Sequence, residues 1–200
     1  MMRSYNVEDS AALPACVAAL AQEGSLLLAP TETVYGLMCS WPDQAARERI
    51  YSAKRRDGRK PLQMLAADLA MVEAGGGVVT ETARRLAAEF CPGPLTVVID
   101  SADGGSLGFR IPGHAFVLAV IRGHGKPLAA TSANLSGEPA ALGVPEALAS
   151  LAEPPDLAVD GGALPADSLA STVVDARGGG LKILREGTIS LAELERAVKA

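Results

Sequence analysis

Aromatic side chains are scarce in this sequence. They make up 4% of its 200 residues, whereas hydrophobic residues as a whole make up 48% and charged residues 20%. This balance argues against a disordered chain and is typical of a globular one. The core is therefore expected to consist mainly of alanine, leucine and valine. A chain of this length fits one domain, and we expect a single domain over residues 1–200.

Long apolar runs are missing as well. No run approaches the roughly 18 residues that a membrane-spanning helix needs. The first ten residues hold one arginine and two acidic residues ahead of any apolar stretch, unlike a secretory signal. We therefore expect a soluble, cytoplasmic protein that makes no use of a membrane. The three cysteines, Cys16, Cys39 and Cys91, form no CxxC pair. This argues against a disulfide framework and a zinc site, and we expect three reduced, buried thiols.

Several signatures of nucleotide and hydrolase sites are also absent. No GxGxxG follows the first expected strand and no GxxxxGK[ST] occurs, which excludes a plain Rossmann unit and a P-loop. The only two histidines, His114 and His124, fall in expected loops and form no Ser/His/Asp arrangement. No metal site is expected. The net charge is −5. Because proteins that bind phosphate backbones are usually basic, any weak RNA contact would depend on a local basic patch.

Hydrophobic patterning predicts alternating helices and strands, with a loose connection of one helix and surface loops over residues 135–170. Residues 115–121 fit a helix or a strand, and we favour a helix. Helices are expected over residues 9–22, 43–54, 80–90, 115–121, 145–151 and 190–199, and strands over 26–29, 62–66, 95–100, 108–111, 128–131, 171–175 and 181–184. This alternation favours the α/β class, with helices packed on a mixed sheet.

Small polar side chains gather where expected strands end, which is where ligands bind in α/β proteins. The segments 29–37 (APTETVYGL) and 127–137 (PLAATSANLSG) both follow a strand. Their polar residues include Thr31, Thr33, Tyr35, Thr131, Ser132, Asn134 and Ser136. Such groups suit a sugar, a base edge or a phosphate. The hydroxyls of the first segment are equally suited to satisfying the backbone of their own turn.

Basic residues are concentrated in residues 54–60 (KRRDGRK), where five of seven are basic, Arg59 among them. Such runs are usually solvated, but Pro61 leads at once into a buried strand and would hold this loop close to the sheet. Lysine and arginine are the groups that a triphosphate requires. Arg110 lies in a strand-like run, as an edge charge or an inward anchor for a carboxylate. Arg185 lies at another strand end.

The motifs occur in the order PTETVYGL, a K-x-R loop ending in KPL, PGPLT, FRIP, ATSANLSG, STVVD and LREG. This succession resembles the YrdC-like family, the threonylcarbamoyl-AMP synthases, from Gly24 to about Gly187. The resemblance implies an open, twisted sheet with a wide, positively charged hollow. The chain ends soon after LREG, so it resembles the short form without an extra C-terminal domain. Leu65 stands where longer members carry a histidine.

The resemblance also implies roles for individual residues. The threonine-binding residues would be Thr31, Arg110, Thr131 and Ser171. The ATP-binding residues would be Lys54, Arg56, Ser132, Asn134 and Arg185. Within these sets, Arg110 would receive the threonine carboxylate, and Lys54 and Arg56 would act as the catalytic pair that holds the phosphates.

The implied enzyme is L-threonylcarbamoyladenylate synthase, a nucleotidyltransferase that condenses L-threonine, bicarbonate and ATP into threonylcarbamoyl-AMP and pyrophosphate. Its product serves the N6-threonylcarbamoyladenosine modification of tRNA, with Mg²⁺ on the phosphates and tRNA-modifying proteins downstream. Two alternatives stay open. An RNA-binding module could use the same basic hollow, although the acidic net charge and the lack of interleaved aromatics argue against it. A paralogue of the same fold could act on another small substrate.

Overall fold

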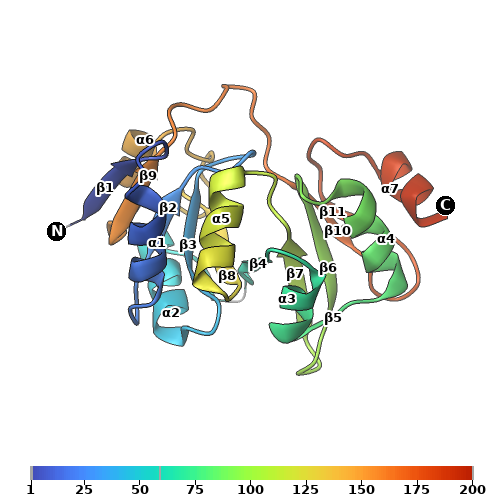
Figure 1. Cartoon of the computed structure of the whole chain (residues 1–200). Coiled ribbons are helices and arrows are strands. Elements are labelled where there is room, and N and C mark those ends of the chain that lie inside the picture. Colours follow the sequence, from blue (N-terminus) through green and yellow to red (C-terminus); the bar gives the residue numbers. More distant parts are fainter. Residues whose placement is uncertain (1, 59, 200) are drawn as a thin grey trace.

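The structure is a computed structural model that describes residues 2–58 and 60–199 (Figure 1). Arg59, part of the basic segment, lies outside the described residues. The strands are β1 (Arg3–Asn6), β2 (Leu27–Ala29), β3 (Gly36–Ser40), β4 (Gln63–Leu65), β5 (Gly77–Val78), β6 (Leu95–Ser101), β7 (Ser106–Arg110), β8 (Leu128–Ser132), β9 (Leu157–Asp160), β10 (Thr172–Asp175) and β11 (Lys182–Arg185). The helices are α1 (Ala12–Leu20), α2 (Gln44–Lys54), α3 (Leu69–Ala74), α4 (Glu81–Phe90), α5 (Ala115–His124), α6 (Val144–Ser150) and α7 (Leu191–Lys199).

All of these strands join one mixed sheet. The order is β1-β9-β2-β3-β8-β4-β7-β6-β10-β11, with β5 paired to β6. The pairs β1–β9, β2–β9, β4–β7 and β6–β10 are parallel, whereas β3 is antiparallel to both of its neighbours. The open mixed sheet that the alternating pattern and the resemblance predicted is confirmed.

Helices cover both faces of one half of the sheet and one face of the other half. In the first half, α1 and α5 pack on one face around Val117, and α2 and α6 pack on the opposite face around Ile50. In the second half, α4 and α7 cover β6, β7 and β10 through Leu86 and Leu194. Figure 1 shows α4 and α7 lying together beside β10 and β11.

The expected helices and strands are all present, with ends displaced by no more than three residues. The helix over residues 115–121 is α5, so helix was the correct choice there. Several helix starts have a clear local cause. At α2, for example, the Asp43 carboxylate accepts from the amide of Ala46 at 2.9 Å. Ser190 and Glu193 form a capping box in which the Ser190 amide donates to the Glu193 carboxylate at 2.9 Å. No described helix is both long and apolar enough to cross a membrane.

Several local predictions were wrong. The 135–170 connection contains β9 as well as a helix, and β9 is buried between β1 and β2. A four-residue run is too short for periodicity to identify it as a strand. β1, β3, β5 and α3 were not predicted. His124 is the last residue of α5 rather than a loop residue. Cys91 is only half-buried, although Cys16 and Cys39 are buried and all three are free thiols.

Candidate functional site

A cavity of about 770 Å³ opens on the face of β4, β7, β6 and β10 opposite their packed helices. Strand alternation decides what lines it, because successive side chains point to opposite faces. In β6, Val97 packs into the core, whereas Thr96 and Val98 line the cavity. In β7, Phe109 is in the core and Arg110 lines the cavity.

The cavity is strongly basic. Its basic lining residues are Arg56, Lys60, Arg110, Arg177 and Arg185, and the described lining contains no aspartate or glutamate. The wide basic hollow predicted from the resemblance is therefore present. Arg177 is neutralised by Asp175, with N–O distances of 2.9 and 2.8 Å. Arg110 is likewise paired with Glu32, at 2.8 Å. Arg56, Lys60 and Arg185 give the cavity a positive potential that attracts anions.

A hydrogen-bonded row of polar groups crosses the cavity. Thr96 Oγ1 donates to Gln63 Oε1 at 3.0 Å and lies 2.8 Å from Ser171 Oγ. Arg185 donates from Nη2 to Ser171 Oγ at 2.9 Å and from Nε to the Ser171 carbonyl at 3.0 Å. Burial lowers the pKa of Arg185, and the charge of Arg110 lowers it further. This row of hydrogen bonds therefore holds the Arg185 guanidinium close enough to Arg110 for the two charges to interact.

Arg110 is buried, with 3% of its surface exposed. Its Nη1 donates to Thr33 Oγ1 at 3.0 Å, and its Nη2 lies 2.8 Å from Glu32 Oε2 in an ion pair that is not aligned as a hydrogen bond. Within the described residues, Nε and Nη2 have no hydrogen-bond partner. Burial lowers the pKa of Arg110, against the opposing effect of Glu32. Nε therefore has no partner among the described residues, and Nη2 faces the Glu32 carboxylate. A second carboxylate that displaced Glu32 could meet Nε and Nη2 with two parallel hydrogen bonds.

Thr31 lies behind the cavity wall. Its Oγ1 donates to the Val34 carbonyl at 2.7 Å and accepts from the amides of Thr33 and Val34 at 3.2 Å each. The Thr31 hydroxyl therefore satisfies its own turn, which is the alternative that the sequence left open. Thr33 and Val34 line the cavity in its place.

Lys54 is fully enclosed, with 1% of its surface exposed. Its Nζ donates to the carbonyl oxygens of Ser132 and Asn134, and its own carbonyl accepts from the amide of Ser136 at 3.1 Å. Burial lowers the pKa of Lys54 from 10.5 to about 8, and the charge of Arg56 contributes. In this structure Lys54 anchors the segment that follows β8 and does not line the cavity.

Replacing Lys54 with methionine is expected to flatten the pH dependence of stability. In the folded protein Lys54 loses its proton near pH 8, whereas in the unfolded chain it keeps it up to about 10.5. The unfolded state binds more protons between these values, so Lys54 makes the unfolding free energy rise with pH across this window. Chemical denaturation at both ends of the window measures this. Equal slopes in the two proteins would contradict it. The variant should also be less stable by roughly 1–3 kcal/mol, because two buried carbonyls lose their donor.

Arg56 faces the opposite way from Lys54 and lines the cavity. Its Nε and Nη2 donate to the carbonyl oxygens of Lys60 and Pro61 at 3.2 and 3.0 Å. Burial lowers the pKa of Arg56. The structure therefore separates the two members of the K-x-R pair: one borders the cavity and one lies behind it.

The segment after β8 borders the same cavity. Thr131 and Ser132 line it. Asn134 lies just behind, where its Nδ2 donates to the carbonyls of Leu135 and Glu138 at 2.8 Å each. The Oδ1 of Asn134 is buried with no partner among the described residues. Buried polar atoms rarely stay unpaired, so this oxygen is a candidate acceptor for a ligand.

Sequence reasoning missed Gln63, Thr96 and Arg177 as lining residues. The alternation of residues 95–100 carried the signal for Thr96, because every second side chain of that strand is apolar and buried. Leu65, which the resemblance matched to a histidine, is 1% exposed and packs in the core with α1 and α5 rather than in the cavity. In the described part of the chain, no group of three His, Cys, Asp or Glu side chains could hold a metal ion.

Comparison with known proteins places these motifs in a family. The model of the Sua5/YciO/YrdC family, described as telomere recombination, matches residues 19–187. The threonylcarbamoyl-AMP synthase of Pyrococcus abyssi is 33% identical over 186 residues, which cover 88% of this chain and 54% of that protein. A putative threonylcarbamoyl-AMP synthase of Mycobacterium leprae is 34% identical over 191 residues, which cover 91% of this chain and 86% of that protein.

A solved structure agrees with the sequence matches. P. abyssi Sua5 in complex with L-threonine superposes with a TM-score of 0.85 at 30% identity, covering 98% of this chain and 60% of that one. The chain spans about half the length of the Pyrococcus relative, 54%. The family match covers most of the chain and includes every strand that borders the cavity. The chain therefore belongs to the Sua5/YciO/YrdC family.

Proposed function

We propose that this chain is an L-threonylcarbamoyladenylate synthase, which condenses L-threonine, bicarbonate and ATP into threonylcarbamoyl-AMP and pyrophosphate. The observation that carries this proposal is the buried Arg110 guanidinium, whose Nε has no hydrogen-bond partner among the described residues, at a basic cavity whose described lining holds no carboxylate. A cavity of about 770 Å³ falls in the range of roughly 300–1,000 Å³ that is usual for small-molecule sites. The names of the relatives support the same activity.

The proposed site has a threonine end and a nucleotide end. Arg110 receives the threonine carboxylate, with Thr131 and Ser171 close to the amino acid and Thr31 supporting the turn behind them. The nucleotide end consists of Arg56, Arg185, Ser132, Asn134 and Lys54. Arg56 and Arg185 meet the phosphates directly. Lys54 acts through the backbone of the segment that it anchors.

The proposed reaction depends on the positioning of its substrates more than on a strong general base. The amine of threonine adds to CO₂ derived from bicarbonate and forms a carbamate. A carbamate oxygen then attacks the α-phosphorus of ATP, the bond to the β-phosphate bridging oxygen breaks, and pyrophosphate leaves. Because the attacking group is already an anion, no side chain has to remove a proton at this step. Fixed cations near the phosphates stabilise the charge that develops in the transition state.

The residues of the cavity suit Mg²⁺ only when the ion is bound together with ATP. The described lining offers hydroxyl and amide oxygens, from residues such as Thr96 and Gln63, but no carboxylate. This donor set suits an ion that is held mainly by the substrate's phosphates and keeps its own waters. Mg²⁺ bound in this way neutralises phosphate charge.

Further parts of the proposal concern the partners of the protein, its location in the cell and its domain boundaries. The product is passed to downstream proteins that modify tRNA to N6-threonylcarbamoyladenosine, and the protein works in the cytoplasm. Residues 1–200 act as one domain, since all described strands share one sheet. The alternatives are an RNA-binding module and a paralogue of this fold that acts on another small substrate.

An omission assay tests the proposed reaction. Pyrophosphate release from ATP should require threonine and bicarbonate together. Without bicarbonate there is no carbamate oxygen to attack, and without threonine there is no amine to form the carbamate. The assay measures pyrophosphate with Mg²⁺ present and with each substrate left out in turn, in degassed buffer.

Each alternative gives a different pattern in the same assay. An amino-acid adenylating enzyme needs threonine but not bicarbonate. An ATPase releases phosphate with neither substrate. An RNA-binding module releases nothing, and a paralogue responds to another small substrate. Full-rate pyrophosphate release in bicarbonate-free buffer, or none in any combination, would overturn the proposal.

A further inference from the structure

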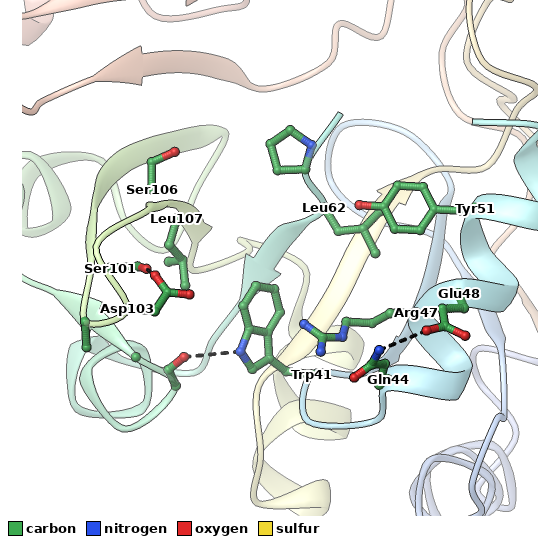
Figure 2. Close-up of a pocket in the computed structure, with 14 residues that line it drawn as sticks. Trp41, Gln44, Arg47, Glu48, Tyr51, Leu62, Ser101, Asp103, Ser106 and Leu107 are labelled. Carbon is green, nitrogen blue, oxygen red and sulfur yellow. Dashed lines mark hydrogen bonds between the residues drawn. The ribbon is translucent and has the colours of Figure 1, made fainter. Parts of the chain in front are cut away.

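A second cavity of about 620 Å³ lies beside the first, and the two share Pro61, Leu62 and Ser106. Helix α2 supplies one wall and the β6–β7 hairpin supplies the opposite wall (Figure 2). Gly75 and Gly76 also line this cavity. None of the residues assigned above to threonine or ATP lines this second cavity. It is therefore a separate site next to the reaction cavity.

Two aromatic rings line the second cavity. Trp41 is the only tryptophan of the sequence, and its Nε1 donates to the Gly75 carbonyl at 3.2 Å. Tyr51 enters the same space from α2, and its hydroxyl donates to the Lys60 carbonyl at 3.1 Å. Both rings are held by their polar ends and remain partly exposed. Fixed aromatic rings that keep part of a face open are platforms on which nucleobases stack.

Charged groups stand on opposite sides of Trp41 in Figure 2. The Arg47 guanidinium lies 5.6 Å from the centre of the indole ring, and among the described residues it forms no ion pair or side-chain hydrogen bond. On the hairpin, Asp103 Oδ1 accepts from the Ser101 hydroxyl and from the Gly105 amide at 3.0 Å. These bonds lower the pKa of Asp103, so its carboxylate is ionised at neutral pH. Its Oδ2 is left to accept from a ligand.

Glu48 is the other carboxylate of this cavity, and one of its oxygens is engaged within α2. Its Oε1 accepts from Gln44 Nε2 at 2.9 Å along the outer side of α2. The arrangement is thus a guanidinium on one side of the Trp41 ring, the Asp103 carboxylate on the other side, and Glu48 on α2 (Figure 2). A ligand that matches it has a planar ring, hydrogen-bond donors on one edge and a negative group on the other side.

We infer that this second cavity binds a guanine nucleotide. The base stacks on the face of Trp41 turned away from Arg47, and the adjacent N1–H and N2–H donors of guanine meet the Asp103 carboxylate (Figure 2). The phosphate passes the edge of the indole and meets Arg47. The nucleotide is either a free mononucleotide or an unpaired residue of an RNA strand, since both present the same chemistry. The inference does not rest on the proposed function, because no residue of the reaction cavity takes part.

The single tryptophan supplies a direct assay on the whole chain. Titration with GMP should quench the fluorescence of Trp41 saturably, with excitation at the red edge of indole absorption where guanine does not absorb. Arg47→Ala and Asp103→Asn should each weaken GMP binding by about ten- to a hundredfold, the usual effect of losing one charged hydrogen bond. Arg122→Ala is the matched control, because Arg122 is an exposed arginine of α5 outside this cavity. It should leave GMP binding unchanged.

Further experiments test which of the two cavities binds GMP and whether the nucleotide is free or part of an RNA strand. Arg185→Ala alters the reaction cavity and should leave GMP quenching intact. Ribose 5-phosphate, which lacks a base, should bind far more weakly than GMP. A short single-stranded RNA with one guanosine, compared with GMP at equal guanine concentration, identifies RNA as the source if it binds more tightly and the free mononucleotide if it does not. Quenching that does not saturate with either probe, survives Arg47→Ala, or disappears in Arg185→Ala overturns the inference.

Discussion

Replacing Arg110 with methionine is expected to lower kcat/KM for threonine by about a hundredfold or more while leaving the KM for ATP nearly unchanged. The variant removes two charge-assisted hydrogen bonds to the threonine carboxylate, and each such bond contributes roughly 1.5–3 kcal/mol. The buried position of Arg110 strengthens the effect, because water cannot replace the lost partner there. Steady-state pyrophosphate release at varied threonine concentration measures it.

The control for Arg110 must separate lost binding from lost folding. The variant also breaks the ion pair with Glu32, measured at 2.8 Å, so its unfolding temperature has to be compared with that of the parent. Arg110→Lys keeps the charge but loses the planar fork, and it should recover only part of the activity. If Arg110→Met is folded, keeps its KM for threonine and raises the KM for ATP, then the carboxylate anchor lies elsewhere.

Replacing Arg185 with alanine is expected to lower kcat/KM for ATP by about ten- to a hundredfold, because a guanidinium that meets the phosphates is lost. The row from Gln63 to Ser171 holds Arg185 in place through bonds of 2.9 and 3.0 Å to Ser171. A pre-positioned cation stabilises developing charge without reorganising, so the effect should fall partly on kcat. Pyrophosphate release at varied ATP concentration, with threonine and bicarbonate saturating, gives both constants.

Arg177 provides a matched control for Arg185. It lines the same cavity, but both of its contacts with Asp175, at 2.9 and 2.8 Å, already neutralise its charge. Arg177→Ala should therefore change kcat/KM for ATP by less than about threefold, as expected for a paired surface charge. Equal losses in Arg177→Ala and Arg185→Ala would mean that net positive charge, rather than a positioned guanidinium, matters in this cavity.

The sequence by itself identified the helices and strands whose apolar residues recur with a clear period. It also identified the uncommon residue types that make up the motifs. The 80–90 helix shows this, because its apolar residues recur on one face and the structure buries Ala83, Leu86 and Ala87 there. Short central strands were harder to predict from the sequence. β3 and β9 are buried throughout most of their length and carry no alternation, so nothing local separates them from loops. Their identity comes from the neighbours that they pair with.

Only the tertiary structure decided which motif residues face the cavity. Helix α2 ends at Lys54, and Arg55 adopts a left-handed conformation with φ of 46°. This change of direction turns Arg56 toward the cavity and leaves Lys54 buried against the segment after β8. Lys54 and Arg56 are only two positions apart in the sequence, but the backbone conformation of Arg55 directs their side chains to different places.

The row that holds Arg185 was equally invisible along the chain. Thr96 and Ser171 are 75 positions apart, and they meet at 2.8 Å because β6 and β10 are neighbours in the sheet. The second cavity arises in the same way, since Trp41 precedes α2 whereas Asp103 belongs to the β6–β7 hairpin. Residue types and local periods are written in the sequence. Contacts between distant segments depend on strand pairing and helix packing, and only the folded chain supplies those.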